Sequence, residues 1–152
     1  MTDSKPSFRT RARELVGTEF HVGEWVTITQ EQIDAFAATT GDNNWIHTDP
    51  VRARQESPYG TTVAHGYLTI ALLPSQMGGF FRKLGATRSI NYGLNRVRFI
   101  APVRAGAKIR AHFTMKSAEE NGDGLRVTND VRVEADDEEK PVCLAETITL
   151  HF

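Results

Sequence analysis

The sequence predicts an α+β protein in which an antiparallel β-sheet wraps around one central α-helix. In the second half of the chain, apolar and polar residues alternate over several segments, which is the pattern of antiparallel strands with one buried face. In the first half, residues 67–73 are apolar nearly all round, which predicts a helix buried on most sides. The chain has 152 residues, so we expect residues 1–152 to form a single domain.

Composition excludes several classes of protein. Lys and Arg number 18 and Asp and Glu number 19, a net charge of −1, which argues against a nucleic-acid-binding protein. The single cysteine, Cys143, rules out an internal disulfide and a multi-cysteine metal site, and its place in a predicted strand indicates a core residue. Residues 67–73 form the longest apolar stretch and fall far short of the ~20 residues of a membrane span. The polar N-terminus does not resemble a secretory signal, so we expect a cytoplasmic protein.

The first half begins with three predicted elements. We expect a short helix over residues 9–16 and a short strand over residues 24–29, where apolar and polar residues alternate. Thr29 stands three residues before Gln32, the spacing of a capping box, and predicts the start of a helix there. Gly41 ends this helix, because glycine accepts the positive φ of a helix C-cap.

Two further helices follow. Asp49 and Pro50 predict a helix start, with the aspartate as N-cap and the proline at the first helical position. This helix ends before the turn residues 57–60. The central helix is expected to begin at or just after His65, and Pro74 kinks or breaks its C-terminal part.

The second half is expected to be an antiparallel meander. The predicted strands cover residues 89–100, 108–117, 125–133 and 142–150, with a hairpin turn at residues 121–124. In the last strand we expect the apolar side chains to form the packed face: Val142, Leu144, Ile148 and Leu150. The free edge and the apolar flank of such a sheet would need cover, which favours a homodimer.

The densest polar cluster lies in residues 41–50, between two predicted helices. It contains Asp42 and His47, a carboxylate and an imidazole five residues apart. Such a pair is suited to general acid–base catalysis, because imidazole titrates near neutral pH. On spacing alone, the alternative is that Asp42 serves the turn and His47 is a surface or hydrogen-bonded histidine.

A second candidate site lies at the start of the central helix. The first N–H groups of a helix have no internal partner, and Gly66 would let a carbonyl oxygen approach the backbone closely. This favours an oxyanion site, whereas the alternative is that Gly66 only packs and His65 caps the helix or lies in the core. A metal site of His47, Asp49 and His65 is disfavoured, because Asp49 is better explained as an N-cap.

These residues, in this order, resemble the signature of the MaoC-like dehydratases, the (R)-specific enoyl-CoA hydratases of the hot-dog fold. The family pattern Gly-Asp-x-Asn-Pro-aliphatic-His, followed five residues later by Ala or Ser, matches residues 41–47 and Ala53, except that Trp45 replaces the proline. A His-Gly pair matches residues 65–66, and a third block matches residues 93–99 with Pro102 and Val103. The Trp-Ile-His variant is most similar to the nodulation protein N-like subgroup.

The resemblance implies a hot-dog homodimer that reversibly hydrates trans-2-enoyl thioesters to (R)-3-hydroxyacyl thioesters. Asp42 would be the general base, and His47 would orient the water and supply the proton that reaches Cα. The Gly66 N–H would bind the thioester carbonyl, and Asn44 would orient the loop. No metal or redox cofactor is implied, because coenzyme A or the pantetheine of a carrier protein arrives with the substrate.

Two departures from the family pattern affect the site. Trp45 is expected either to wall the acyl channel or, as aromatic residues more often do, to brace the loop from behind. Family hydratases often carry a serine one turn into the central helix, where this chain has Ala71, or Thr69 if the helix is rotated.

Two other functions compete with the hydratase. A hot-dog thioesterase is disfavoured, because residues 67–77 contain no carboxylate. A non-catalytic acyl-CoA-binding or interaction module would be expected to lack Asp42 or His47, and both are present.

Overall fold

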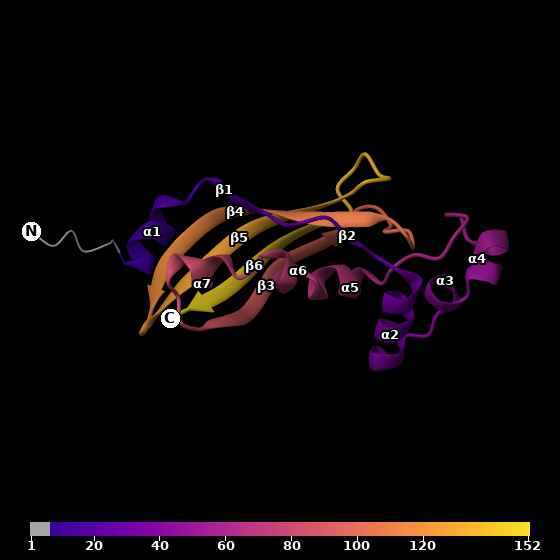
Figure 1. Ribbon diagram of the computed structural model, residues 1–152, viewed down its shortest axis with the longest axis horizontal. Coiled ribbons are helices and arrows are strands. Elements are labelled where there is room, and N and C mark those ends of the chain that lie inside the picture. The colour runs from indigo at the N-terminus through magenta and orange to yellow at the C-terminus, as the bar shows by residue number, and fades with distance from the viewer. Residues whose placement is uncertain (1–6) are drawn as a thin grey trace, which may run out of the picture.

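The computed structural model describes residues 7–152 and is built on one curved antiparallel sheet (Figure 1). Its strands are β1 (Glu19–Val22), β2 (Val26–Thr27), β3 (Ser89–Phe99), β4 (Lys108–Asn121), β5 (Gly124–Ala135) and β6 (Cys143–His151). The strand order is β1-β4-β5-β6-β3, and β2 also pairs with β4. The four long strands therefore come from the second half of the chain, as the alternation of apolar residues predicts.

The helices lie on one face of the sheet and at its two ends. They are α1 (Phe8–Glu14), α2 (Gln30–Thr40), α3 (Trp45–Thr48), α4 (Pro50–Glu56), α5 (Gly66–Ala71), α6 (Leu73–Gln76) and α7 (Phe80–Leu84). Figure 1 shows α5 and α6 running along the sheet, with α2, α3 and α4 gathered at one end and α1 and α7 at the other. This is the hot-dog arrangement, so the predicted fold class is confirmed.

The predicted helix boundaries of the first half agree with local capping geometry. Thr29 caps α2 through a complete capping box with Gln32, and Gly41 ends the helix at φ 80°. The Asp49 side chain accepts a hydrogen bond from the backbone N–H of Arg52 at 2.9 Å, which caps α4. Each of these signals acts within about one helical turn, which is why the sequence alone predicts them.

Two short elements differ from the prediction. The strand expected over residues 24–29 is reduced to Val26–Thr27, and β1 precedes it at Glu19–Val22. The pairing of β1 with β4 contains a register shift between Glu19 and His21, which breaks the simple alternation that sequence patterns detect. The one-turn helix α3 also lies in the stretch expected to be a loop.

The central helix begins where the sequence predicts, with His65 as the N-cap residue of α5. Ahead of Pro74, Leu72 separates α5 from α6. The expectation that the helix is buried on most sides is wrong for one face, because Tyr67 is 74% exposed and Ala71 is also exposed. The reason is that the sheet does not close around the helix and covers only the face that carries Leu68.

The packed face of the sheet agrees with the prediction in β4 and β5. The buried apolar side chains there are Ile109, Ala111, Phe113, Met115, Leu125, Val127, Val131, Val133 and Ala135, and the polar Asn129 is buried among them. Cys143 is fully buried, as expected, and burial raises the pKa of its thiol to about 11. Within residues 7–152, no helix is long and apolar enough to span a membrane.

The packed face of β6 is the reverse of the prediction. Val142, just ahead of the strand, is buried as predicted, but within β6 Leu144 is 42% exposed, whereas Cys143 and Ala145 are buried. The reason is register: Cys143 is paired with Val133 and Ala145 with Val131, and directly paired residues share a face of the sheet. The odd-numbered residues of β6 therefore point inward, and those at its C-terminal end are polar.

Candidate active site

The loop after α2 positions the first two predicted site residues. Asp42 follows the Gly41 cap directly, and Asn44 then starts α3 by accepting a hydrogen bond from the Ile46 N–H at 3.2 Å. The single turn of α3 carries His47, whose backbone N–H bonds to the Asn44 carbonyl at 2.9 Å. Two successive caps thus fix the separation of the carboxylate and the imidazole.

Asp42, His47 and His65 converge at the end of the central helix. One ligating atom from each residue lies within 4.8 Å of the others. The rings of His47 and His65 stack with centroids 3.8 Å apart. His65 is only 3% exposed, whereas the Asp42 side chain is 58% exposed, so the cluster has a buried side and a side open to solvent. A water molecule held between Asp42 and His47 would meet this open side.

The hydrogen bonds of His47 determine which of its nitrogens faces the site. Its Nδ1 lies 2.7 Å from the Val63 carbonyl oxygen. A backbone carbonyl only accepts, so Nδ1 carries a proton and donates it. Nε2 is then free for chemistry, and it carries a proton of its own only when the ring is an imidazolium.

His65 holds the loop in place from behind. Its Nε2 donates to the backbone carbonyl of Asp42 at 2.9 Å, and the ring packs against Phe36 at 5.1 Å between centroids. Its Nδ1 is buried without a hydrogen-bond partner among the described residues. His65 therefore acts on the backbone at Asp42, and its side chain bridges the first candidate site and the start of α5.

Gly66 occupies the first position of α5, and its N–H has no acceptor among residues 7–152. A Cβ at this position would lie 2.8 Å from carbons of the Phe99 ring, which is too close for any side chain without movement. Phe99 is 47% exposed and also contacts Tyr67 edge-on, with ring centroids 6.1 Å apart. Glycine therefore allows the Phe99 ring to lie directly against the start of α5, and any larger residue would have to displace this ring.

A cavity of about 300 Å³ opens beside these groups. The residues that line it are Ile46, His47, Tyr59, Val63, Ala64, Gly66, Thr69, Phe99, Ile100, Ala101, Pro102, Val103 and Val142. Thr69 lines this cavity and Ala71 does not, so Thr69 is the polar residue one turn into the helix that faces the site. Sequence patterns did not single out Tyr59 or Phe99, because only the fold brings these aromatic residues to the cavity.

The remaining predicted residues lie around the site. Trp45 carries the Arg52 guanidinium over its ring at 4.4 Å and does not line the cavity, which favours the bracing role over the wall. Asp49 caps α4 and does not belong to the cluster. The carboxylate that lies near His47 and His65, and could ligate a metal with them, is that of Asp42 and not that of Asp49. Each of the two imidazoles already uses one nitrogen to hold the backbone.

Comparisons with known proteins show relatives that are similar over most of the chain. Residues 11–138 match the MaoC-like domain family. The chain is 45% identical over 147 residues to 3-hydroxyacyl-thioester dehydratase Z of Mycobacterium tuberculosis, covering 96% of this chain and 94% of that protein. It is 40% identical over 137 residues to nodulation protein N of Rhizobium leguminosarum bv. viciae, covering 89% of this chain and 85% of that protein.

Solved structures share the fold at lower identity. An (R)-hydratase from A. caviae involved in PHA biosynthesis has a TM-score of 0.67 at 23% identity, over 86% of this chain and 96% of that one. The match to the family covers most of the chain, and the relatives are similar over nearly their full length. The protein therefore belongs to the MaoC-like dehydratase family.

Proposed function

We propose that this hydro-lyase is an (R)-specific enoyl-CoA hydratase, which reversibly hydrates trans-2-enoyl thioesters to (R)-3-hydroxyacyl thioesters. The observation that carries the proposal is the meeting of the Asp42 carboxylate and the His47 imidazole, within 4.8 Å, beside the cavity that the Gly66 backbone lines. The name of the 45% identical relative, a 3-hydroxyacyl-thioester dehydratase, supports a thioester substrate.

Asp42 and His47 divide the proton transfers between them. The water oxygen bonds to Cβ of the enoyl group, and Asp42 takes the proton that this oxygen loses. Cα receives its proton from Nε2 of His47. Because Nδ1 of His47 already donates to the Val63 carbonyl, Nε2 has a proton to give only in the imidazolium form. The reactive state therefore pairs an Asp42 carboxylate with a His47 imidazolium, and the proton returns from Asp42 to His47 after turnover.

The Gly66 N–H supplies the third element of the mechanism. As water adds to Cβ, negative charge develops on the thioester oxygen, and a positioned N–H stabilises that charge more than it stabilises the neutral carbonyl. Phe99 lies directly over Gly66 and is half exposed, so its ring has room to move when the thioester enters. Asn44 and His65 position the loop that carries Asp42 and His47, through hydrogen bonds to its backbone.

The proposed chemistry needs no metal and no redox cofactor. General acid–base groups and one N–H perform each proton and charge transfer, and no electron pair leaves the carbon skeleton as a hydride. Coenzyme A or the pantetheine of a carrier protein is present only as the thiol half of the substrate.

Two alternatives make different predictions. A hot-dog thioesterase would use a carboxylate on the central helix, and neither α5 nor α6 carries one. A non-catalytic acyl-CoA-binding module would bind acyl-CoA without turnover, although the loop that carries Asp42 and His47 is fully assembled here.

The test is a spectrophotometric hydration assay with crotonyl-CoA and longer enoyl-CoAs. We expect Asp42→Asn and His47→Gln each to lower the rate by about 10²–10⁴-fold, the usual contribution of general acid–base catalysis. The double variant is expected to cost much less than the product of the two, because both residues act on one water. Asp49→Asn is the matched control, since asparagine caps a helix as well as aspartate.

Near-native rates in both single variants would contradict the proposed roles of Asp42 and His47. Losses that simply multiply in the double variant would contradict the shared water. Acyl-CoA binding without hydration of any enoyl thioester by the unaltered protein would favour the binding module.

We also propose that the protein is a homodimer that covers the free edge of β3. Among the described strands, β3 ends the sheet and pairs only with β6. Its apolar side chains are exposed: Ile90, Tyr92, Leu94 and Phe99. Sedimentation is expected to give twice the chain mass of 16.9 kDa, and Tyr92→Lys is expected to shift it towards the monomer. A monomer at micromolar concentration would contradict this proposal.

A further inference from the structure

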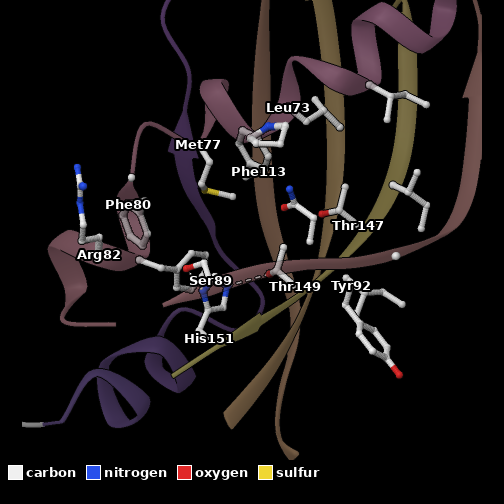
Figure 2. Close-up of a pocket in the computed structure, with 18 of the residues that line it drawn as sticks. Leu73, Met77, Phe80, Arg82, Ser89, Tyr92, Phe113, Thr147, Thr149 and His151 are labelled. Carbon is white, nitrogen blue, oxygen red and sulfur yellow. Dashed lines mark hydrogen bonds between the residues drawn. The ribbon is translucent and has the colours of Figure 1, made fainter. Parts of the chain in front are cut away.

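A second and larger cavity lies farther along the central helix. Its volume is about 580 Å³, and it is bounded by the α5–α7 segment on one side and by β3 and β6 on the other. Figure 2 shows that the helical side is apolar, with Leu73, Met77 and Phe80, while Phe113 reaches in from β4. The strand side is different, because Ser89, Thr147, Thr149 and His151 line it.

His151 forms the centre of the polar strand side. Its Nδ1 lies 2.8 Å from Oγ of Ser89, and its Nε2 lies 2.8 Å from Oγ1 of Thr149. The ring stacks on Phe81 with centroids 3.7 Å apart, and the residue is 3% exposed. Both hydroxyls therefore share one imidazole inside the fold.

One of these two hydroxyls keeps a free proton. Burial lowers the pKa of His151 to about 4, so the ring is neutral near pH 7. A neutral imidazole has one N–H and one bare nitrogen. The hydroxyl at the bare nitrogen donates its proton to the ring, while the hydroxyl at the N–H accepts and keeps its own proton. In either tautomer, one O–H from Ser89 or Thr149 is left to donate to a ligand.

A second row of polar side chains extends this surface. Asn91 is paired with Thr149 across β3 and β6, and Asn129 is paired with Thr147 across β5 and β6. Asn91 and Thr147 line the cavity. Asn129 is fully buried, and neither atom of its amide has a hydrogen-bond partner among the described residues. A buried amide without a partner costs about 1–3 kcal/mol, so this part of the inner face is polar at a cost to stability.

The polar side of the cavity carries no formal charge. Among residues 7–152, the one charged residue that lines the cavity as a whole is Arg82, whose side chain points away from His151 in Figure 2. The donors and acceptors are hydroxyls, amides and a neutral imidazole, which suit a neutral oxygen such as a hydroxyl or a ketone. The apolar helical side suits an alkyl chain that leads to this oxygen.

The position of the cavity relates it to the active site. Ile70 lines the larger cavity, and the preceding residue, Thr69, lines the cavity at Gly66. From Ile70 to Met77 the chain advances roughly 10 Å at helical rise, away from Gly66. An acyl chain whose thioester lies at Gly66 would therefore reach the polar side chains with its distal end.

We propose that this cavity binds the distal end of the acyl chain and selects chains that carry a neutral oxygen there, as a hydroxyl or keto group. The proposal rests on the proposed acyl-thioester function and adds a substrate class to it. Thr147, Thr149 and Ser89 are the specificity-determining residues, since their hydroxyls face the cavity and do not touch the reacting carbons.

The test compares acyl-CoAs of equal length that differ only at the distal end. Calorimetric titration with decanoyl-CoA and ω-hydroxydecanoyl-CoA, and with the octanoyl and dodecanoyl pairs, measures the preference directly. An apolar cavity would favour the methyl end, because a hydroxyl loses hydration on entry. We expect the opposite sign, with the hydroxylated chain of at least one length bound about 3–10-fold more tightly, the contribution of one net hydrogen bond.

Matched variants connect the preference to the cavity. Thr147→Val keeps the shape of the side chain and removes its hydroxyl, and Ser89→Ala with Thr149→Val removes the two hydroxyls at His151. Both variants are expected to bring the ratio of the two affinities, for the hydroxylated and the methyl-ended chain, towards one. Thr114→Val, on the opposite face of the sheet, is the control and is expected to keep it.

Three outcomes would overturn the inference: no preference at any length, a preference for the methyl end, or a preference unchanged in both cavity variants. Hydration of crotonyl-CoA by the same preparations separates this result from the proposed function. Hydration without the preference overturns only the cavity assignment, whereas the preference without hydration supports the assignment and contradicts the hydratase.

Discussion

Protonation of His151 is expected to destabilise the fold as the pH falls below neutrality. The imidazole is 3% exposed and stacked on Phe81, and burial lowers its pKa to about 4 from an ordinary value of 6.5. A histidine with a depressed pKa binds its proton more readily in the unfolded chain. Its contribution to stability is therefore present above pH 6.5 and is lost as the pH falls towards 4.

The magnitude follows from the two pKa values. The free energy of unfolding is expected to fall by about 2 kcal/mol between about pH 7.5 and pH 5, and by about 3 kcal/mol by pH 4. The range between about pH 7.5 and pH 5 is the better one for measuring the effect of His151. Glu134, a partly exposed carboxyl whose pKa is also strongly shifted, titrates below its ordinary value of 4.5 and so contributes little above pH 5. Cys143, with a pKa of about 11, titrates far above this window.

Urea unfolding at fixed protein concentration, at several values between about pH 7.5 and pH 5, measures this loss. His151→Gln keeps a hydrogen-bonding side chain and removes the titration. We expect its stability curve to be flatter by about 2 kcal/mol over this window, whatever its absolute stability. An equal pH dependence in the variant and the unaltered protein would refute the reasoning.

Two further predictions concern Gly66 and Glu134. Gly66→Ala is expected to change the melting temperature little, because the half-exposed Phe99 ring can move aside, but to lower hydration at least about tenfold by placing a methyl group at the oxyanion position. An unchanged rate in Gly66→Ala would contradict the role of this N–H. Hydrogen bonds from His112 and then Arg110 lower the pKa of Glu134 to about 2, so its contribution is present above pH 4.5 and is lost as the pH falls towards 2. Because Glu134 is a quarter exposed, urea unfolding is expected to show a loss of about 1–2 kcal/mol between about pH 5 and pH 3 that Glu134→Gln lacks.

The parts of the fold that could be predicted from the sequence are those encoded within a few residues. The capping box of Thr29 and Gln32, and the Asp49–Pro50 helix start, each depend on contacts inside one turn. The long alternations in β4 and β5 predict their buried faces because their apolar residues occupy one side consistently. Asp42 and His47 share one loop, so their meeting is also a local property.

The parts that could not be predicted depend on partners distant in the chain. The large aliphatic residues of β6 occupy even positions, yet register with β5 turns the odd positions inward. The open face of the central helix depends on how far the sheet extends around it. Phe99 joins the site only when strand β3 and the start of α5 are brought to the same end of the molecule, whereas His65 is already a candidate from the sequence.

The reversed face of β6 and the second cavity have the same physical origin. If Leu144 and Leu150 pointed inward, apolar side chains would fill the space beneath α6, and no polar surface would form there. Pairing of Cys143 with Val133 instead carries the inward face on to Thr147, Thr149 and His151. Three polar side chains on the inner face of a sheet are costly unless something hydrogen-bonds to them. The Ser89 and Thr149 hydroxyls satisfy His151, but the Asn129 amide has no partner within residues 7–152. The strand register that contradicts the sequence pattern is thus the same feature that prepares the cavity for an oxygen-bearing ligand. Asn129→Leu, which nearly keeps the volume of the side chain, is accordingly expected to stabilise the ligand-free protein.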